Sequence, residues 1–285
     1  MKHLSKSAFA VFFCLIFFIN CSEQVEIEKN RINAKDMEFV GLEHNEILEK
    51  TFIILKKEKK EIKIDRKSNS KKNHLKRILT EVISNTEKYS EEAKKNGIKS
   101  VEIFFKKEET LSKSINNLKA EYLFLTKKEQ FYLKELELIL SNIDINNVAD
   151  NSLLKSIVNL EKTIESDDNL NNDQLLVLFS TTQTAKYSFL YWKDNLNNWI
   201  DLSSDKSNHS KSASYLSRDC DCDGPAKFNK AAGEIVSADA AGAVAGAVGA
   251  AAVNVVIGPG QAAYGAAIVG TAATSSAFVA ATKFF

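Results

Sequence analysis

The sequence predicts an all-α protein, a helical bundle domain followed by a polar linker and an Ala/Gly-rich helical hairpin. Apolar residues recur every three or four positions through most of 37–202, which is the helical period. Proline is absent from the first 224 residues, and glycine occurs there only at 41, 97 and 224. The stretch 99–105, "KSVEIFF", has strand-like composition, but an isolated strand cannot pair its own ladder. A bundle of long helices is therefore the economical interpretation.

The N-terminus, "MKHLSKSAFAVFFCLIFFINCSEQ", has two early lysines, an uncharged run over 8–19, and Cys21. This pattern is typical of an export signal. It resembles the signal peptides of bacterial lipoproteins, in which the cysteine becomes the acylated first residue. We therefore expect 1–20 to be the signal peptide, Cys21 the lipidation site and 21–36 a tether. An ordinary signal peptide or an uncleaved anchor is the alternative.

Charge and cysteine content limit the class of protein. The chain has 38 Lys and Arg against 37 Asp and Glu, and the signal contains two of the lysines. A nearly neutral mature chain has no field of one sign that would attract nucleic acid, so no nucleic-acid partner is predicted. No cysteine occurs between 23 and 219, so the helical domain must fold without disulfides.

Within the predicted domain, 37–202, apolar stripes indicate helices in the ranges 47–55, 75–93, 111–125, 153–164 and 175–192. Asn45 is expected to cap the first helix, with His44 as a local hydrogen-bonding partner. Gly97 stands where a C-cap glycine would end the second helix. Thr126 and Glu129 form a capping-box signature for a new helix or a kink.

Three aromatic residues near the end of the domain, Tyr191, Trp192 and Trp199, are expected to pack in the core, with a sugar-binding platform as the alternative. The stretch 56–77 has eleven basic residues against three acidic ones. It could lie on anionic headgroups beside the lipid anchor or form a solvated helix face.

The sequence offers few catalytic groups. Histidines occur at 3, 44, 74 and 209, without a second histidine at metal-ligand spacing. A phosphate-binding glycine loop is absent before Gly224, and no Gly-x-Ser-x-Gly nucleophile motif is present. We therefore predict a non-enzymatic protein without a cofactor, apart from the calcium considered next.

The predicted linker, 203–225, contains "DCDCDG", in which Asp219, Asp221 and Asp223 alternate before Gly224. Alternate carboxylates on a tight turn can converge on calcium. An EF-hand is excluded because its twelfth position would be Lys230. Another calcium turn remains open, against a solvated acidic segment. The two cysteines between the carboxylates could form a thiol metal pair or a local disulfide.

The tail, 226–285, has no charged residue from 240 to 282, and Gly258, Pro259 and Gly260 divide this run into arms of 18 and 22 residues. As helices, the arms would span ~27 to ~33 Å, close to one bilayer core. Spacing by four lets helix backbones approach closely in lipid. These small residues predict a membrane-associated glycine-zipper hairpin: Gly242, Gly246, Ala250, Ala266 and Gly270. A close-packed hairpin in water or a disordered tail is the alternative.

Three short stretches, "VGLEHNEILE", "SFLYWKDNLNNW" and "ADAAGAVAGAVGAA", resemble a set found in uncharacterised lipoproteins of Bacteroidota-type bacteria. The tail alone is similar to the glycine-zipper region of class II bacteriocin-like peptides. These resemblances carry no catalytic residue. They imply an exported cell-envelope lipoprotein, at the outer membrane or cell surface, with membrane lipid and self-association through the hairpin as partners. The alternatives are a secreted pore-forming antibacterial effector and a calcium- or glycan-binding envelope module.

Overall fold

The computed structural model describes residues 31–61, 68–111, 125–141, 151–203, 234–244, 246 and 268–277. Over these ranges the chain forms helices and turns without strands, so the predicted all-α class is confirmed. Residues 32–285 belong to one compact unit. We call 32–203 the body, 234–244 the first tail helix and 268–277 the second tail helix.

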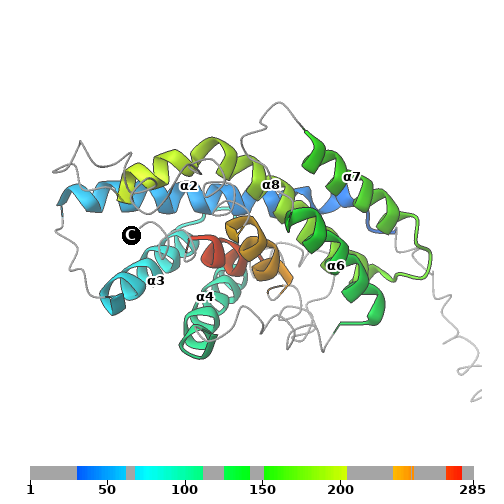
Figure 1. Ribbon diagram of the computed structural model, residues 1–285. Helices are drawn as coiled ribbons and strands as arrows, with labels where there is room; N and C mark the ends of the chain where they lie inside the picture. Colours follow the sequence, from blue (N-terminus) through cyan, green and yellow to red (C-terminus); the bar gives the residue numbers. More distant parts are fainter. Residues whose placement is uncertain are drawn as a thin grey trace, which may run out of the picture. The chain divides into compact units, whose positions relative to one another are not determined.

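The body begins with the 3₁₀ helix η1 (Ala34–Met37), followed by six labelled α-helices (Figure 1). The Asn33 side chain accepts hydrogen bonds from Lys35 N and Asp36 N, and the Asp36 carboxylate accepts one from Asn33 N. This capping box starts the helical segment. The α-helices are α2 (Glu38–Glu61), α3 (Ser68–Ser84), α4 (Glu91–Leu111), α6 (Lys127–Ser141), α7 (Ser152–Glu165) and α8 (Asn172–Ser203).

Helices α2 and α8 pack along one another and form the longest contact of the body (Figure 1). Their axes approach closely at Gly41. A Cβ atom there would lie 2.5 Å from the Tyr187 ring and 2.7 Å from the Gln183 carbonyl oxygen. Only glycine fits this crossing without displacing α8. Helices α3 and α4 pack as a second pair, and α6 and α7 as a third.

Several predicted helix ends are confirmed or corrected. Thr126 N donates to the Glu129 carboxylate at 2.8 Å and Glu129 N donates to Thr126 Oγ1 at 3.3 Å, so the predicted capping box starts α6. The prediction of one helix from 75 to Gly97 is wrong. Helix α3 ends at Ser84, and α4 begins at Glu91 after Ser90 Oγ accepts from Ala93 N. Gly97 therefore lies inside α4, as does the strand-like stretch 99–105.

Asn45 is also corrected, because α2 begins seven residues before it. Its side chain does not cap a helix but donates from Nδ2 to the Tyr187 carbonyl oxygen of α8 at 2.9 Å. Residues 112–124, which include most of the third predicted helix, lie outside the described residues.

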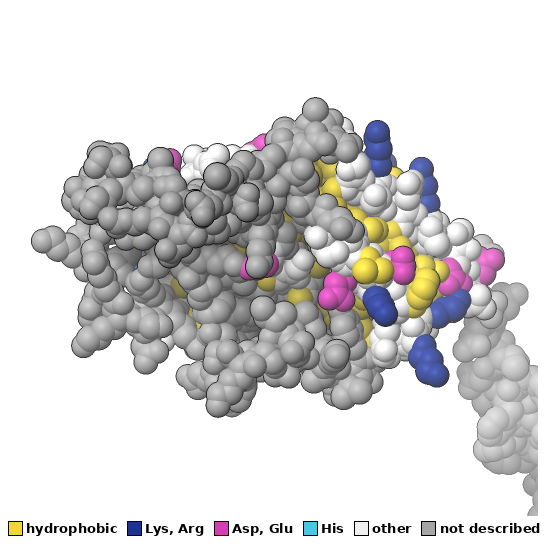
Figure 2. Space-filling view, viewed as in Figure 1, with side chains coloured by type: hydrophobic (Ala, Val, Ile, Leu, Met, Phe, Trp, Pro, Cys, Tyr) yellow, Lys and Arg dark blue, Asp and Glu magenta, His cyan; other side chains and the backbone are white. Residues whose placement is uncertain are grey.

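The aromatic residues of α8 belong to the core, as predicted. Trp192 and Trp199 are fully buried, and their ring centroids lie 5.3 Å apart. Phe52 of α2 packs on Trp199 at 5.4 Å. Apolar side chains also reach the surface among charged ones where α6 and α7 lie (Figure 2), and Phe131 and Leu138 of α6 are more than half exposed.

Candidate functional site

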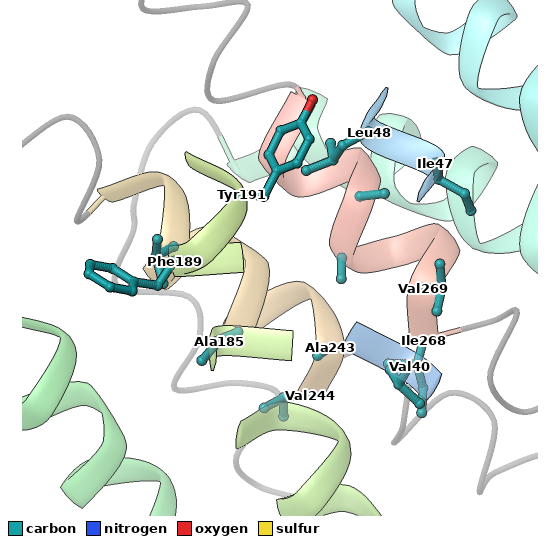
Figure 3. Close-up of a cluster of buried hydrophobic side chains, with 14 of the residues drawn as sticks. Val40, Ile47, Leu48, Ala185, Phe189, Tyr191, Ala243, Val244, Ile268 and Val269 are labelled. Carbon is teal, nitrogen blue, oxygen red and sulfur yellow. The ribbon is translucent and has the colours of Figure 1, made fainter. Parts of the chain in front are cut away.

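The two tail helices are buried against the body. Every described residue from 268 to 277 is buried, and so are Ile235, Val236, Asp239 and the range 242–244 of the first tail helix. Apolar side chains from α2, α8 and both tail helices pack into one cluster (Figure 3). Where the structure describes them, the Ala/Gly faces that the sequence leaves without an obvious partner are therefore covered by protein.

Small residues set how closely the tail helices approach their neighbours. A Cβ atom at Gly242 would lie 2.6 Å from Ser275 Oγ and 2.8 Å from Ala272 Cα, so this glycine faces the other tail helix. A Cβ atom at Gly270 would lie 3.1 Å from the Gly97 carbonyl oxygen, so that glycine faces α4. One of the two predicted small-residue faces thus joins the tail helices, and the other joins the tail to the body.

A carboxylate lies at the centre of the buried interface. Asp239 of the first tail helix is fully buried, and its Oδ2 atom accepts three hydrogen bonds. Ser188 Oγ is one donor; Trp192 Nε1, at 3.3 Å, and Ser276 Oγ, at 2.9 Å, are the others. Trp192 Nε1 also donates to Ser276 Oγ at 2.9 Å. Two body residues and one residue of the second tail helix therefore converge on one oxygen.

His44 of α2 approaches the other carboxylate oxygen. Its Nε2 atom lies 3.5 Å from Asp239 Oδ1, and both side chains have no exposed surface. This separation is longer than an ordinary hydrogen bond. Among the described residues, neither atom has a hydrogen-bond partner. The pair is therefore the least tightly bonded part of the cluster.

The neighbouring hydrogen bonds determine where the protons of His44 lie. Asn45 Nδ2 donates to the Tyr187 carbonyl oxygen, so Asn45 Oδ1 is the atom that faces His44 Nδ1, at 2.9 Å. An amide oxygen only accepts, so Nδ1 must carry a proton. The other ring nitrogen, Nε2, is the one that faces Asp239 Oδ1.

An aromatic pair extends the polar cluster along α8. Trp199 Nε1 donates to the Tyr191 hydroxyl at 3.1 Å, and that hydroxyl donates to the Glu49 carboxylate at 3.3 Å. Burial raises the pKa of Tyr191, and the negative charges of Glu49 and Asp239 add to this effect. Tyr191 therefore stays a neutral donor toward α2.

The arrangement is suited to holding a helix. Ser188 directs its hydroxyl proton at the carboxylate, so the imidazole is not placed to activate this serine as a nucleophile. The residue types needed for a metal site also do not gather: no group of three or more His, Cys, Asp or Glu side chains is found within the described ranges. The groups present bind one another across the body–tail interface.

Most of the predicted site residues do not belong to the Asp239 cluster. Gly242 and Gly270 are buried in the two tail helices, and Gly246, just beyond the first of them, is buried as well. Several others lie outside the described residues: Cys21, Asp219, Cys220, Asp221, Cys222, Asp223, Ala250, Gly258, Pro259, Gly260 and Ala266. No helix in the described part of the chain combines the length and apolarity needed to cross a bilayer.

Sequence reasoning missed Asp239, Ser188 and Ser276, and it gave His44 only a local role. One signal was available: Asp239 is the last charged residue before the uncharged run. A second was the position of His44 one turn before Ile47 and Leu48, on the apolar face of α2.

The fold and this interface define a class: an all-α protein in which two Ala/Gly-containing helices from the C-terminal part of the chain are packed against a helical body. No protein family, curated protein or solved structure matches the chain.

Proposed function

We propose that this chain is an exported, lipid-anchored, non-enzymatic protein of the cell envelope, whose body shelters a membrane-associating hairpin. Cys21 is the acylated residue, and the tail is the second membrane contact. The observation that carries the proposal is the complete burial of the second tail helix within a body whose surface bears charged side chains. A segment without charge over 240–282 needs such cover outside a bilayer.

The hydroxyl groups of the second tail helix support the proposal. Thr274 Oγ1 donates to the Gly270 carbonyl oxygen at 2.6 Å, and Ser275 Oγ donates to the Thr271 carbonyl oxygen at 2.9 Å. Both hydrogen bonds lie within the helix, so these hydroxyls keep their acceptors whether the helix packs against protein or lies in hydrocarbon. Moving the helix into a bilayer therefore leaves neither hydroxyl unpaired.

The packing of the small residues supports it as well. Gly242 already brings the first tail helix against the backbone of the second, at Ala272 Cα and the Thr271 carbonyl oxygen. Close approach of this kind does not depend on water, so the same pair can persist in lipid. The contact of Gly270 with Gly97 is a body contact that the tail must give up.

A tethered variant tests the sheltering. Ile83 Cδ1 of α3 lies 3.4 Å from the Cβ position of residue 270, so the double variant Ile83→Cys, Gly270→Cys places two thiols across the body–tail interface, where a short thiol-reactive crosslinker can join them. The mature chain would carry Cys21→Ala, Cys220→Ser and Cys222→Ser to leave one cysteine pair. We expect the protein without crosslinker to float with phosphatidylethanolamine/phosphatidylglycerol vesicles and the crosslinked protein to stay in solution. Absence of flotation in the protein without crosslinker would refute the proposal.

Anchoring by Cys21 is tested separately. Cells expressing the full chain with and without Cys21→Ala are fractionated, and their membranes are washed in alkaline carbonate. We expect the unchanged chain to stay with the washed membrane, because several acyl chains together give stable anchoring. An unacylated Cys21 in the mass spectrum of the full chain recovered from these membranes would contradict lipidation at this residue.

A second candidate is a secreted pore-forming antibacterial effector, favoured by the same sheltered, uncharged tail. It differs from the first in its consequence for the target membrane. Release of a trapped dye from vesicles by the full mature chain, at concentrations where it also floats, would favour the effector; flotation without leakage would favour the anchor. A calcium-binding role for the linker 203–225 is a third proposal, tested by calorimetry of the full chain with calcium.

A further inference from the structure

We propose that Asp239 is the residue by which the body retains the tail, and that its body contacts must break before the tail enters a bilayer. This inference rests on the proposed function. It assigns retention to His44, Ser188 and Trp192 of the body, acting together on one carboxylate of the tail. These three are positioning residues, because they act by holding the tail in place.

The argument begins with which contacts are lost on transfer. Apolar packing between Gly270, Gly97 and Ile83 is replaced by packing against lipid chains, which are equally apolar. Such apolar contacts therefore contribute little to the free-energy difference between the tail in the body and the tail in the bilayer. Hydrogen bonds from Ser188 and Trp192 to Asp239 have no replacement in hydrocarbon. These directional contacts therefore decide which environment the tail prefers.

The position of Asp239 makes it effective in this role. It is the last charged residue before the run 240–282, so it lies where the tail leaves the polar part of the chain. Asp239 also accepts a hydrogen bond from Ser276 Oγ of the second tail helix, so the same carboxylate links both tail helices. Loss of the carboxylate should therefore loosen both tail helices.

The pairing with His44 supplies a weak point at which the retention can yield. The 3.5 Å separation of Nε2 and Oδ1 exceeds an ordinary hydrogen bond, and neither atom has a hydrogen-bond partner among the described residues. The carboxylate is therefore held firmly through Oδ2 and only weakly through Oδ1.

The test compares Asp239→Asn with Asp194→Asn, the same chemical change at an exposed position of α8. In solution, we expect Asp239→Asn to speed hydrogen exchange of the tail amides about tenfold or more, while amides of α6 and α7 keep their protection. Asp194→Asn should exchange like the unchanged chain. Vesicle flotation of Asp239→Asn should rise by a similar factor.

Two further variants keep the inference falsifiable. His44→Gln should raise tail exchange less than Asp239→Asn, and the double variant should add little, because both changes act on one contact. Full additivity would overturn the shared role. If Asp239→Asn unfolds throughout, Ser188→Ala removes only one body donor to Asp239 and should show the same pattern more weakly; unchanged tail exchange in that variant would overturn retention.

Tryptophan emission provides an independent readout. The chain has two tryptophans, and both Trp192 and Trp199 belong to this cluster. A red shift on vesicle binding reports opening of the cluster itself. If the unchanged chain binds vesicles and Asp239→Asn behaves like Asp194→Asn, retention is refuted and the proposed function stands. If tail exchange rises but no variant binds vesicles, retention within the body stands and the proposed function falls.

Discussion

His44 Nε2 faces Asp239 Oδ1 at 3.5 Å across the boundary between α2 and the first tail helix. His44 Nδ1 is fixed as a donor by Asn45 Oδ1 on its other side. The two contacts place His44 and Asp239, both fully buried, where body and tail meet. These two residues are 195 positions apart in the sequence, and their contact can be followed by nitrogen-15 spectroscopy of the His44 ring.

The Nδ1 atom of His44 should carry a proton, because the Asn45 amide oxygen that faces it can only accept a hydrogen bond. Nitrogen-15 spectra of the imidazole are expected to show a pyrrole-type Nδ1. An imidazole protonated only at Nε2 in the unchanged chain would contradict the hydrogen-bond assignment, and His74 serves as an internal comparison.

Gly41→Ala should destabilise the protein. The added methyl would sit 2.5 Å from the Tyr187 ring and 2.7 Å from the Gln183 carbonyl oxygen. Overpacking costs about 1–3 kcal/mol, which exceeds the gain of about 0.5–1 kcal/mol that alanine brings to a helix. Chemical denaturation measures the difference. Lys57→Ala, on the exposed side of α2, is the matched control and should change stability little. If the Gly41→Ala protein were as stable as this control, helices α2 and α8 could move apart to accommodate the methyl group at no cost in stability.

Glu161→Gln should stabilise the protein at neutral pH. Burial raises the pKa of Glu161 more than the attraction of Lys186 lowers it. A raised folded pKa gives a contribution that is present below the ordinary glutamate value, about 4.3, and is lost as pH rises through the folded value. Glutamine avoids this loss and can still accept from Gln183 Nε2, which lies 2.9 Å from Glu161 Oε1.

The gain in melting temperature for Glu161→Gln should therefore be present at pH 7 and vanish near pH 4. Glu165→Gln, exposed one turn later on α7, is the control and should show no such pH dependence. A destabilised Glu161→Gln protein at pH 7 would mean that the Lys186 contact, at 3.8 Å, outweighs the burial.

Asp167→Asn should have the opposite pH dependence. Lys128, first, and then Asn169 and Tyr132 lower the pKa of the Asp167 carboxyl, and Lys128 Nζ lies 2.6 Å from both carboxylate oxygens. A lowered folded pKa gives stability that is present above the ordinary aspartate value, about 3.9, and is lost as pH falls toward the folded value. Asparagine removes it.

We expect Asp167→Asn to lower the melting temperature at pH 7 and to approach the unchanged chain below pH 3. Asp168→Asn, its exposed neighbour, is the control. Equal effects of the two changes at pH 7 would show that the bonds to Lys128 and Tyr132 contribute nothing measurable, as exposed ion pairs sometimes do.

Much of the body could be predicted from local patterns. The stripe from Leu153 to Ile164 became α7, and the signature of Thr126 and Glu129 became the start of α6. These features depend on residues within one or two turns of each other. The break between α3 and α4 was missed because a short turn closed by Tyr89 N to Thr86 O, at 3.1 Å, interrupts an otherwise continuous apolar period.

The sequence by itself determined the helical class, the absence of disulfides in the body and the uncharged character of the tail, because composition and period are local properties. It also required that something cover the Ala/Gly faces. Only the tertiary structure decided that α3, α4 and the partner tail helix cover them, and that Asp239 meets His44, Ser188 and Trp192. Partners so far apart in the chain are selected by the fit of whole helices, and no short stretch of sequence records that fit.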